Sequence, residues 1–226
     1  MGEMIEFPSN GSSAPGYLSL PESGQGPGLI VIQEWWGLVD HIKDVCDRFA
    51  AAGFVALAPD LYHGQTVAEP DEAGKAMMAL QMDQAARDLS GAVDEVVRRS
   101  VGGRIGVVGF CMGGGLALVL AANRPDAVAA VVPCYGVIPW PDAQPDYRAM
   151  TAALLGHYAE NDDFFTPEAA RALGEQLRAM GKEAEIIVYP GVDHAFFNDT
   201  RPEVYSSSAA AELWERSVAF LHAQLG

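Results

Sequence analysis

The chain has 226 residues, half of them apolar, which is enough for one α/β domain with a substantial core and excludes disordered and fibrous folds. Thirty acidic residues against fourteen basic ones give a net charge of −16, which argues against a nucleic acid or an anionic membrane surface as a partner. The first residues show no cationic, apolar leader, and no apolar run is long enough for a membrane span, so we expect a cytoplasmic protein.

In chain order, the first expected element is an antiparallel pair of strands at the edge of a sheet. Residues 4–7 and 17–20 form this pair, on either side of an Asn-Gly-Ser-Ser turn. Short apolar runs rich in β-branched residues follow, and they are typical of buried parallel strands. These runs are 29–33, 54–57, 105–108, 129–133, 153–156 and 184–189.

Helical spacing of the apolar residues between these runs predicts crossover helices. One begins near Asp40, one covers 85–96, one starts at the capping hydroxyl of Thr166 and stops at Gly181, and the last fills 209–225. Strands alternating with helices predict a doubly wound, mainly parallel sheet with helices on both faces, in a single α/β domain over residues 1–226. In such a sheet the ligand site lies beyond the carboxyl ends of the strands.

The strongest local signal is a sharp turn from strand to helix, Gly109-Phe-Cys111-Met112-Gly113. It fits the nucleophile elbow of hydrolases, with sulfur in place of the usual serine oxygen. Glycines two residues before and after the nucleophile are needed because the strand and the helix come very close there. At the helix N-terminus, the dipole and the free amides favour a thiolate on Cys111, and the Met112 amide can bind an oxyanion.

Plainer interpretations of this turn stay open. Cys111 can be a small buried apolar residue, beside glycines that only allow a helix to pack on a sheet. A dinucleotide-binding turn is the other alternative, although it needs a glycine where Cys111 stands. The remaining cysteines, Cys46 and Cys134, are widely spaced, so neither a disulfide framework nor a zinc site is expected.

An elbow also predicts an acid and then a histidine on later loops, and both are present. His194 follows the run at 184–189 and would take the proton of the Cys111 thiol. Asp162 and Asp163 follow the run at 153–156, and we expect Asp162 to orient the His194 ring. One acid of this pair then serves only to lead into the next helix.

The run at 29–33 leads into Glu34-Trp35-Trp36-Gly37. In this architecture that loop supplies the second oxyanion donor, here the Trp35 amide. Glu34 would point into the site, where its negative charge would keep the resting Cys111 thiol neutral until substrate displaces it. An acid solvated at a strand end is the alternative.

Together these motifs resemble the dienelactone hydrolase family of the α/β-hydrolase superfamily, over nearly the whole chain. The resemblance rests on residues 33–37, 58–62, 109–114, 162–165 and 189–198. It implies a Cys-Asp-His triad on Cys111, Asp162 and His194, with Glu34 contacting the resting cysteine. An apolar residue three places after the family's acid favours Asp162, whereas counting back from Pro167 favours Asp163, so the choice between them stays open.

Two positions depart from the family pattern. Members that act on dienelactone carry arginines that hold the substrate carboxylate, one just after the Leu-Tyr pair and one four residues after the histidine. Here those places hold Gly64 and Asn198. Arg148 or Lys75 are candidate replacements. We expect the loops 64–82 and 135–150 to wall the pocket, and the expected substrate contacts are Tyr62, Tyr135, Phe196 and Asn198.

The sequence thus predicts a hydrolase that cleaves a small activated ester or lactone, of the dienelactone type or related to it, through an acyl-cysteine. We expect a monomer or small homo-oligomer that needs no metal or cofactor and binds neither nucleic acid nor a membrane. One alternative is a redox-active or thiol-exchange protein in which Cys134 is the partner of Cys111. Another is a protein that binds a ligand on a hydrolase fold without catalysis.

Overall fold

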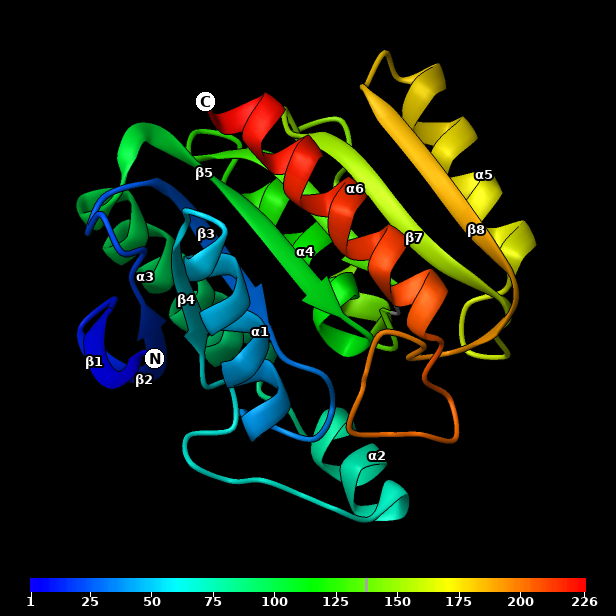
Figure 1. Cartoon of the computed structure of the whole chain (residues 1–226), viewed down its shortest axis with the longest axis horizontal. Coiled ribbons are helices and arrows are strands. Elements are labelled where there is room, and N and C mark those ends of the chain that lie inside the picture. The colour runs from blue at the N-terminus through cyan, green and yellow to red at the C-terminus, as the bar shows by residue number, and fades with distance from the viewer. Residues whose placement is uncertain (137) are drawn as a thin grey trace.

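The computed structural model describes residues 1–136 and 138–226. Val137, which belongs to one of the loops expected to wall the pocket, lies outside the described residues. Within them, eight strands form one sheet in the order β1-β2-β4-β3-β5-β6-β7-β8 (Figure 1). The strands are β1 (Glu3–Ser9), β2 (Ser12–Ser19), β3 (Pro27–Ile32), β4 (Val55–Pro59), β5 (Val101–Phe110), β6 (Val128–Cys134), β7 (Ala153–Asn161) and β8 (Ala184–Asp193).

The sheet is parallel from β4 through β8, and only β1 and β2 at one edge are antiparallel. The edge hairpin and the six strands expected from the sequence are therefore confirmed. The run at 184–189 is not buried as expected, because it forms β8 at the other edge of the sheet, where only Tyr189 of this run is buried. Residues of the central strands β3, β4 and β6 are buried almost throughout, because helices cover both faces of the sheet.

Helices α1 and α6 lie on one face of the sheet, and α3, α4 and α5 lie on the other (Figure 1). Phe49 of α1 packs on Trp214 of α6, with 4.5 Å between the ring centroids. This arrangement confirms the doubly wound prediction. The helices are α1 (Asp40–Ala51), α2 (Pro70–Met78), α3 (Met82–Arg99), α4 (Met112–Asn123), α5 (Pro167–Ala179) and α6 (Ser207–Leu225), with a 3₁₀ turn η1 (Pro141–Ala143).

Two local features show how well the helix ends could be predicted. The Thr166 hydroxyl caps α5 as expected, since its Oγ1 accepts a hydrogen bond from the Ala169 amide at 3.3 Å. Helix α2 was not expected, because a nine-residue helix with a central Gly74 has little apolar period. Its start signals are local: Pro70 occupies the first turn, and acidic residues follow it near the positive end of the helix dipole.

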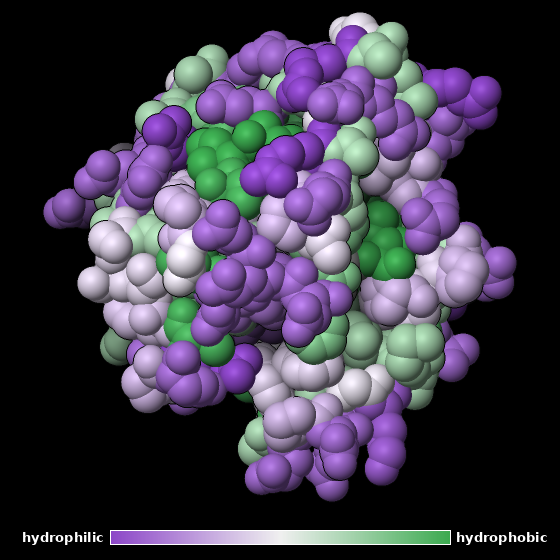
Figure 2. Space-filling model, turned by 90° about the vertical axis from the view of Figure 1, so that its right-hand side faces the viewer, coloured by the Kyte–Doolittle hydropathy of each residue, from purple (hydrophilic) through white to green (hydrophobic). Residues whose placement is uncertain are grey.

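Polar residues cover most of one side of the molecule (Figure 2). Figure 2 shows the side of the molecule at the right of Figure 1, where apolar residues gather only in separate small patches. In the described part of the chain, no helix is both long and apolar enough to cross a membrane.

Candidate active site

Cys111 stands at the junction between β5 and α4, at the carboxyl edge of the sheet. Its backbone has φ 54° and ψ −120°, in the positive-φ region that non-glycine residues rarely occupy. The Cys111 amide donates to the carbonyl of Cys134 on the neighbouring strand at 3.0 Å, which helps to hold this conformation. A strained residue fixed in this way at the mouth of a cavity has the geometry of a nucleophile elbow.

Two glycines let the chain make this turn. A Cβ atom on Gly109 would collide with the backbone of Gly113, and one on Gly113 would collide with the carbonyls of Ile32 and Gln33. The first turn of α4 therefore lies directly against the end of β3. The glycine spacing seen in the sequence has this close backbone approach as its cause.

His194 follows β8 directly and lies beside Cys111, with one ring nitrogen bonded to an acid. Its Nδ1 is 2.7 Å from Oδ2 of Asp162, whose other oxygen accepts hydrogen bonds from the amides of Phe164 and Phe165. Asp162 is 4% exposed, so its carboxylate is held rigidly. Asp163 is exposed and lies on the rim of the cavity. Of the two candidate acids, Asp162 is the one that contacts the histidine.

The His194 ring is set up to carry a proton. Burial alone lowers its pKa, but the hydrogen bond with Asp162 and the contact with the Cys111 thiol outweigh this effect and raise the pKa to about 10. With Nδ1 facing Asp162, Nε2 is the nitrogen available to Cys111.

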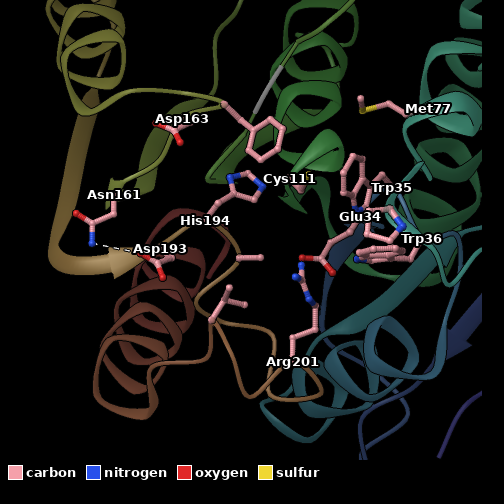
Figure 3. Close-up of a pocket in the computed structure, with 14 residues that line it drawn as sticks. Glu34, Trp35, Trp36, Met77, Cys111, Asn161, Asp163, Asp193, His194 and Arg201 are labelled. Carbon is pink, nitrogen blue, oxygen red and sulfur yellow. Dashed lines mark hydrogen bonds between the residues drawn. The ribbon is translucent and has the colours of Figure 1, made fainter. Parts of the chain in front are cut away.

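Glu34 lies deep in the site, on the loop after β3. Its side chain is buried, its Oε2 accepts a hydrogen bond from Asn198 at 2.7 Å, and its Oε1 has no hydrogen-bond partner in the described part of the chain. Burial raises its pKa, against the opposing influence of Asn198, His194 and Arg201. Figure 3 shows the carboxyl group turned toward Arg201. Glu34 thus accepts its hydrogen bond from Asn198. Among the described residues, no hydrogen bond joins Glu34 to the Cys111 thiol, although that contact was expected.

Two backbone amides are available near the sulfur. Met112 is the first residue of α4, so its N–H has no acceptor within the helix. The Trp35 amide donates to no residue among those described. Both amides were expected to bind an oxyanion, and neither is occupied in a way that would prevent it.

A cavity of about 340 Å³, here called the main cavity, opens above Cys111 and His194. Its walls combine aromatic rings, acidic groups, the His194 imidazole and the Arg201 guanidinium, as Figure 3 shows. It is lined by Glu34, Trp35, Trp36, Pro70, Met77, Cys111, Asn161, Asp163, Phe164, Asp193, His194, Ala195, Arg201 and Val204.

The four expected substrate contacts are not among these wall residues, which corrects the sequence-based picture of the pocket. Tyr135, Phe196 and Asn198 are buried beneath the cavity, and the Tyr135 ring packs edge-on against His194 with 5.1 Å between the centroids. Tyr62 turns its hydroxyl to the sulfur of Met112 at 3.6 Å. The backbone of Tyr135 has φ 40°, a strained conformation that the sequence did not reveal. In this conformation the Tyr135 side chain is buried and does not line the cavity.

Arg201 is a wall residue that sequence reasoning missed. Its guanidinium lies 5.5 Å from the centre of the Trp36 ring, and its Nε donates to Glu203 at 2.8 Å. It stands in a loop without periodicity, so only the basic residue itself, seven places after His194, could have signalled it. Neither expected replacement lines the cavity: Arg148 pairs with Asp146 at the surface, and Lys75 is exposed on α2.

The remaining candidates for a reactive group near the site are the Cys134 thiol and a metal site. Cys134 is fully buried, and burial raises the pKa of its thiol well above the usual value. Among residues 1–136 and 138–226, no three His, Cys, Asp or Glu side chains gather as a metal site would require.

Comparison with known proteins gives one consistent picture. The model of the dienelactone hydrolase family matches residues 14–225. "Protein usf" of Aquifex pyrophilus is 38% identical over 229 residues, covering 97% of both chains, and the "Putative carboxymethylenebutenolidase" of Aquifex aeolicus is 36% identical over 233 residues, covering both chains completely. The crystal structure of a "Putative Dienelactone Hydrolase" from Klebsiella pneumoniae superimposes with a TM-score of 0.89 at 30% identity, covering 98% of each chain.

Proposed function

The chain belongs to the dienelactone hydrolase family and is a hydrolase of small molecules, and we propose that it cleaves an activated ester or lactone through an acyl-cysteine on Cys111. One observation carries the proposal. The strained Cys111 lies beside His194, and a buried Asp162 holds the ring of that histidine from the far side. The proposed nucleophile and base thus line one cavity, and the group that orients the base is buried behind it.

In the proposed reaction, the proton of the Cys111 thiol passes first to Nε2 of His194, as the raised pKa of that ring favours, and Sγ then attacks the carbonyl carbon as a thiolate. The carbonyl electron pair moves onto oxygen, and the Met112 and Trp35 amides donate hydrogen bonds to this oxyanion. When the tetrahedral intermediate collapses, the C–O bond breaks and the leaving oxygen takes the proton from His194. Water then loses a proton to His194 and attacks the thioester, which releases the acid and restores the thiol.

Glu34 would influence the charge next to the sulfur in this scheme. A second negative charge near a thiolate is unfavourable. Because burial raises the pKa of Glu34, its protonated form coexists with a thiolate more easily than an ionised carboxylate would. Its hydrogen bond with Asn198 keeps it in place during the reaction.

The leaving group decides which substrates suit this site. A thiolate leaves a tetrahedral intermediate more readily than an alkoxide does, so a simple alkyl ester mostly returns to starting material. Enol lactones, aryl esters and thioesters have better leaving groups. We therefore propose activated substrates, with lactones of the dienelactone type among them.

Arg201 is the group that would receive a carboxylate of such a substrate. It is the one arginine or lysine among the wall residues identified, in a protein of net charge −16. A guanidinium binds a carboxylate with two parallel hydrogen bonds. In this proposal Arg201 takes over the task of the family arginines that Gly64 and Asn198 replace.

Stopped-flow release of p-nitrophenol from p-nitrophenyl acetate tests the mechanism, with wild type, Cys111→Ala and His194→Ala and with dienelactone run in parallel. We expect a wild-type burst near one equivalent that disappears in Cys111→Ala, and slow acylation in His194→Ala. Burst and turnover that survive Cys111→Ala would refute the acyl-cysteine. The rate of dienelactone hydrolysis shows whether this site, with Arg201 in place of the family arginines, accepts that substrate.

A redox or thiol-exchange protein remains the alternative function, and the surroundings of Cys134 speak against it. A resolving thiol needs thiolate character, whereas Cys134 is fully buried with a strongly raised pKa. Titration of thiols after peroxide separates the two functions. Paired loss of two thiols that dithiothreitol reverses would favour exchange over hydrolysis.

A further inference from the structure

A second cavity of about 260 Å³, here called the side cavity, adjoins the main cavity. The two share Met77 and Phe164 as walls. Phe164 is 64% exposed, yet its ring lies 5.0 Å from that of His194 and 6.1 Å from that of Trp35, centroid to centroid. A large apolar side chain thus stands exposed at the junction, next to the candidate base.

The chemistry of the side cavity differs from that of the main cavity. Its described walls carry no charged group, and most of them are aliphatic or aromatic, such as Leu118, Ile138 and Leu173. The polar groups are the Gln144 amide at the rim and the Tyr147 hydroxyl. The main cavity, by contrast, is lined by three carboxyl groups and Arg201. A molecule that fills both would be polar at one end and apolar at the other.

A hydrogen bond connects two opposite walls of the side cavity. Trp140, on the segment after β6, donates from its indole Nε1 to the carbonyl of Met77 at 3.2 Å. This bond ties α2 to the segment that forms the opposite wall. Tyr147 is half-buried in the opposite wall, and this burial raises the pKa of its hydroxyl to about 12.

We propose that the side cavity binds an unbranched aliphatic chain of the ester substrate, carried by its acyl or its alcohol part. The inference rests on the proposed function, because it takes the scissile carbonyl to lie at Cys111. A charged or strongly polar arm would lose its hydration there without finding a partner. An aliphatic chain gains by burial against the apolar walls and covers Phe164 and Met77 at the junction.

The first test is a chain-length series with matched variants. Gln144→Trp narrows the mouth of the side cavity, and Gln176→Trp places the same residue on an exposed position of α5 outside it. For p-nitrophenyl esters from acetate to octanoate, we expect kcat/KM of the wild type and of Gln176→Trp to rise about fourfold per methylene until the cavity is full. We expect Gln144→Trp to lose most of this rise while its acetate rate stays within about twofold.

A second series separates the two sources of the chain, with aryl acetates extended on the alcohol part instead of the acyl part. One part of the ester, acyl or alcohol, should raise kcat/KM when it is lengthened in wild type but not in Gln144→Trp. That part is the one that binds in the side cavity. Tyr147→Ala provides an independent variant, since it enlarges the cavity and should move the optimum to longer chains. Equal slopes in wild type, Gln144→Trp and Tyr147→Ala for both series would overturn the proposal.

A binding measurement keeps this inference distinct from the proposed mechanism. We expect saturation-transfer NMR to detect 1-hexanol on Cys111→Ala, and at least tenfold weaker binding after Gln144→Trp is added. Hexanol binding that persists when no acyl-cysteine burst is found would refute the mechanism and retain the chain site. A burst without hexanol binding, or binding indifferent to Gln144→Trp, would refute the chain site and retain the mechanism.

Discussion

The carboxylate of Asp162 and the imidazole of His194 meet with 2.7 Å between Oδ2 and Nδ1, although 32 residues of chain separate them. β7 and β8 are parallel neighbours, so the segments that follow their carboxyl ends are brought side by side. The crossover helix α5 accounts for the long separation in sequence. The contact between Asp162 and His194 therefore depends on one strand pair at the edge of the sheet.

The adjacent acids Asp162 and Asp163 make a matched pair for testing this contact. We expect Asp162→Asn to lower kcat by roughly 10²–10⁴-fold, because the His194 ring loses its orientation and the stabilisation of its charge. Asp163→Asn should stay within about twofold, since Asp163 lies exposed on the rim. Turnover of p-nitrophenyl acetate measures both, with circular dichroism as a check of folding. A larger loss of kcat in Asp163→Asn than in Asp162→Asn would assign the role of the orienting acid to Asp163.

Arg201 can be tested by comparing a charged with a neutral substrate. We expect Arg201→Gln to reduce kcat/KM for dienelactone by about tenfold to hundredfold, the range of one or two charge-assisted hydrogen bonds. Hydrolysis of neutral p-nitrophenyl acetate should change little. Arg201→Lys should recover part of the loss, because it restores a point charge without the fork. Equal losses on both substrates would instead point to an effect through neighbouring Glu34.

Burial of Glu34 predicts a pH-dependent cost in stability. Its pKa in the folded protein lies above the usual value of 4.5, so the stability that its protonated form contributes is present below pH 4.5 and lost as the pH rises through the folded pKa. Glu34→Gln escapes this loss. Its Tm should exceed that of the wild type by a margin that widens as the pH rises from 4.5 to the folded pKa of Glu34, with about 2–4 °C for each kcal/mol.

The control for this experiment is Glu6→Gln, an exposed glutamate on β1. Its difference from the wild type should not widen over the same pH range. A constant or shrinking margin for Glu34→Gln would show that Glu34 ionises in the fold as easily as in the unfolded chain.

The close approach of backbone at Gly113 predicts a strong effect of one methyl group. We expect Gly113→Ala to destabilise the protein by about 1–3 kcal/mol, because its Cβ would collide with the carbonyls of Ile32 and Gln33. Gly74→Ala is the matched change in α2, where the nearest atom to a Cβ is a Trp35 carbon at 3.9 Å, so we expect a neutral or slightly stabilising effect. Urea denaturation compares the two. Equal stability would mean that the elbow can relax.

The sequence was sufficient for the sheet and for the residues nearest the sulfur, since both have local signals. β-branched runs predicted the strands, and Cys111, Asp162 and His194 each follow the end of such a run. The structure brings these three together at one edge. Their catalytic roles stay a prediction, as do the single-domain organisation over 1–226 and the oligomeric state.

The walls of the cavity could not be predicted in the same way. Tyr135 and Phe196 lie next to motif residues, yet both are fully buried, because backbone conformation and not neighbourhood in sequence decides where a side chain points. Met77 and Arg201 reach the cavity from segments that fold back over the sheet edge. Such long-range placement leaves no period or spacing in the sequence.

The order of the elements divides the chemistry of this protein between two parts of the chain. The proposed nucleophile and both candidate oxyanion amides lie before residue 113, whereas the proposed acid, the proposed base and Arg201 lie after residue 161. The exposed segment around Asp142 separates the two parts. A protein divided there would have two fragments that each lack half of the reacting groups, so ester turnover in their mixture would report reassembly of the sheet between β6 and β7.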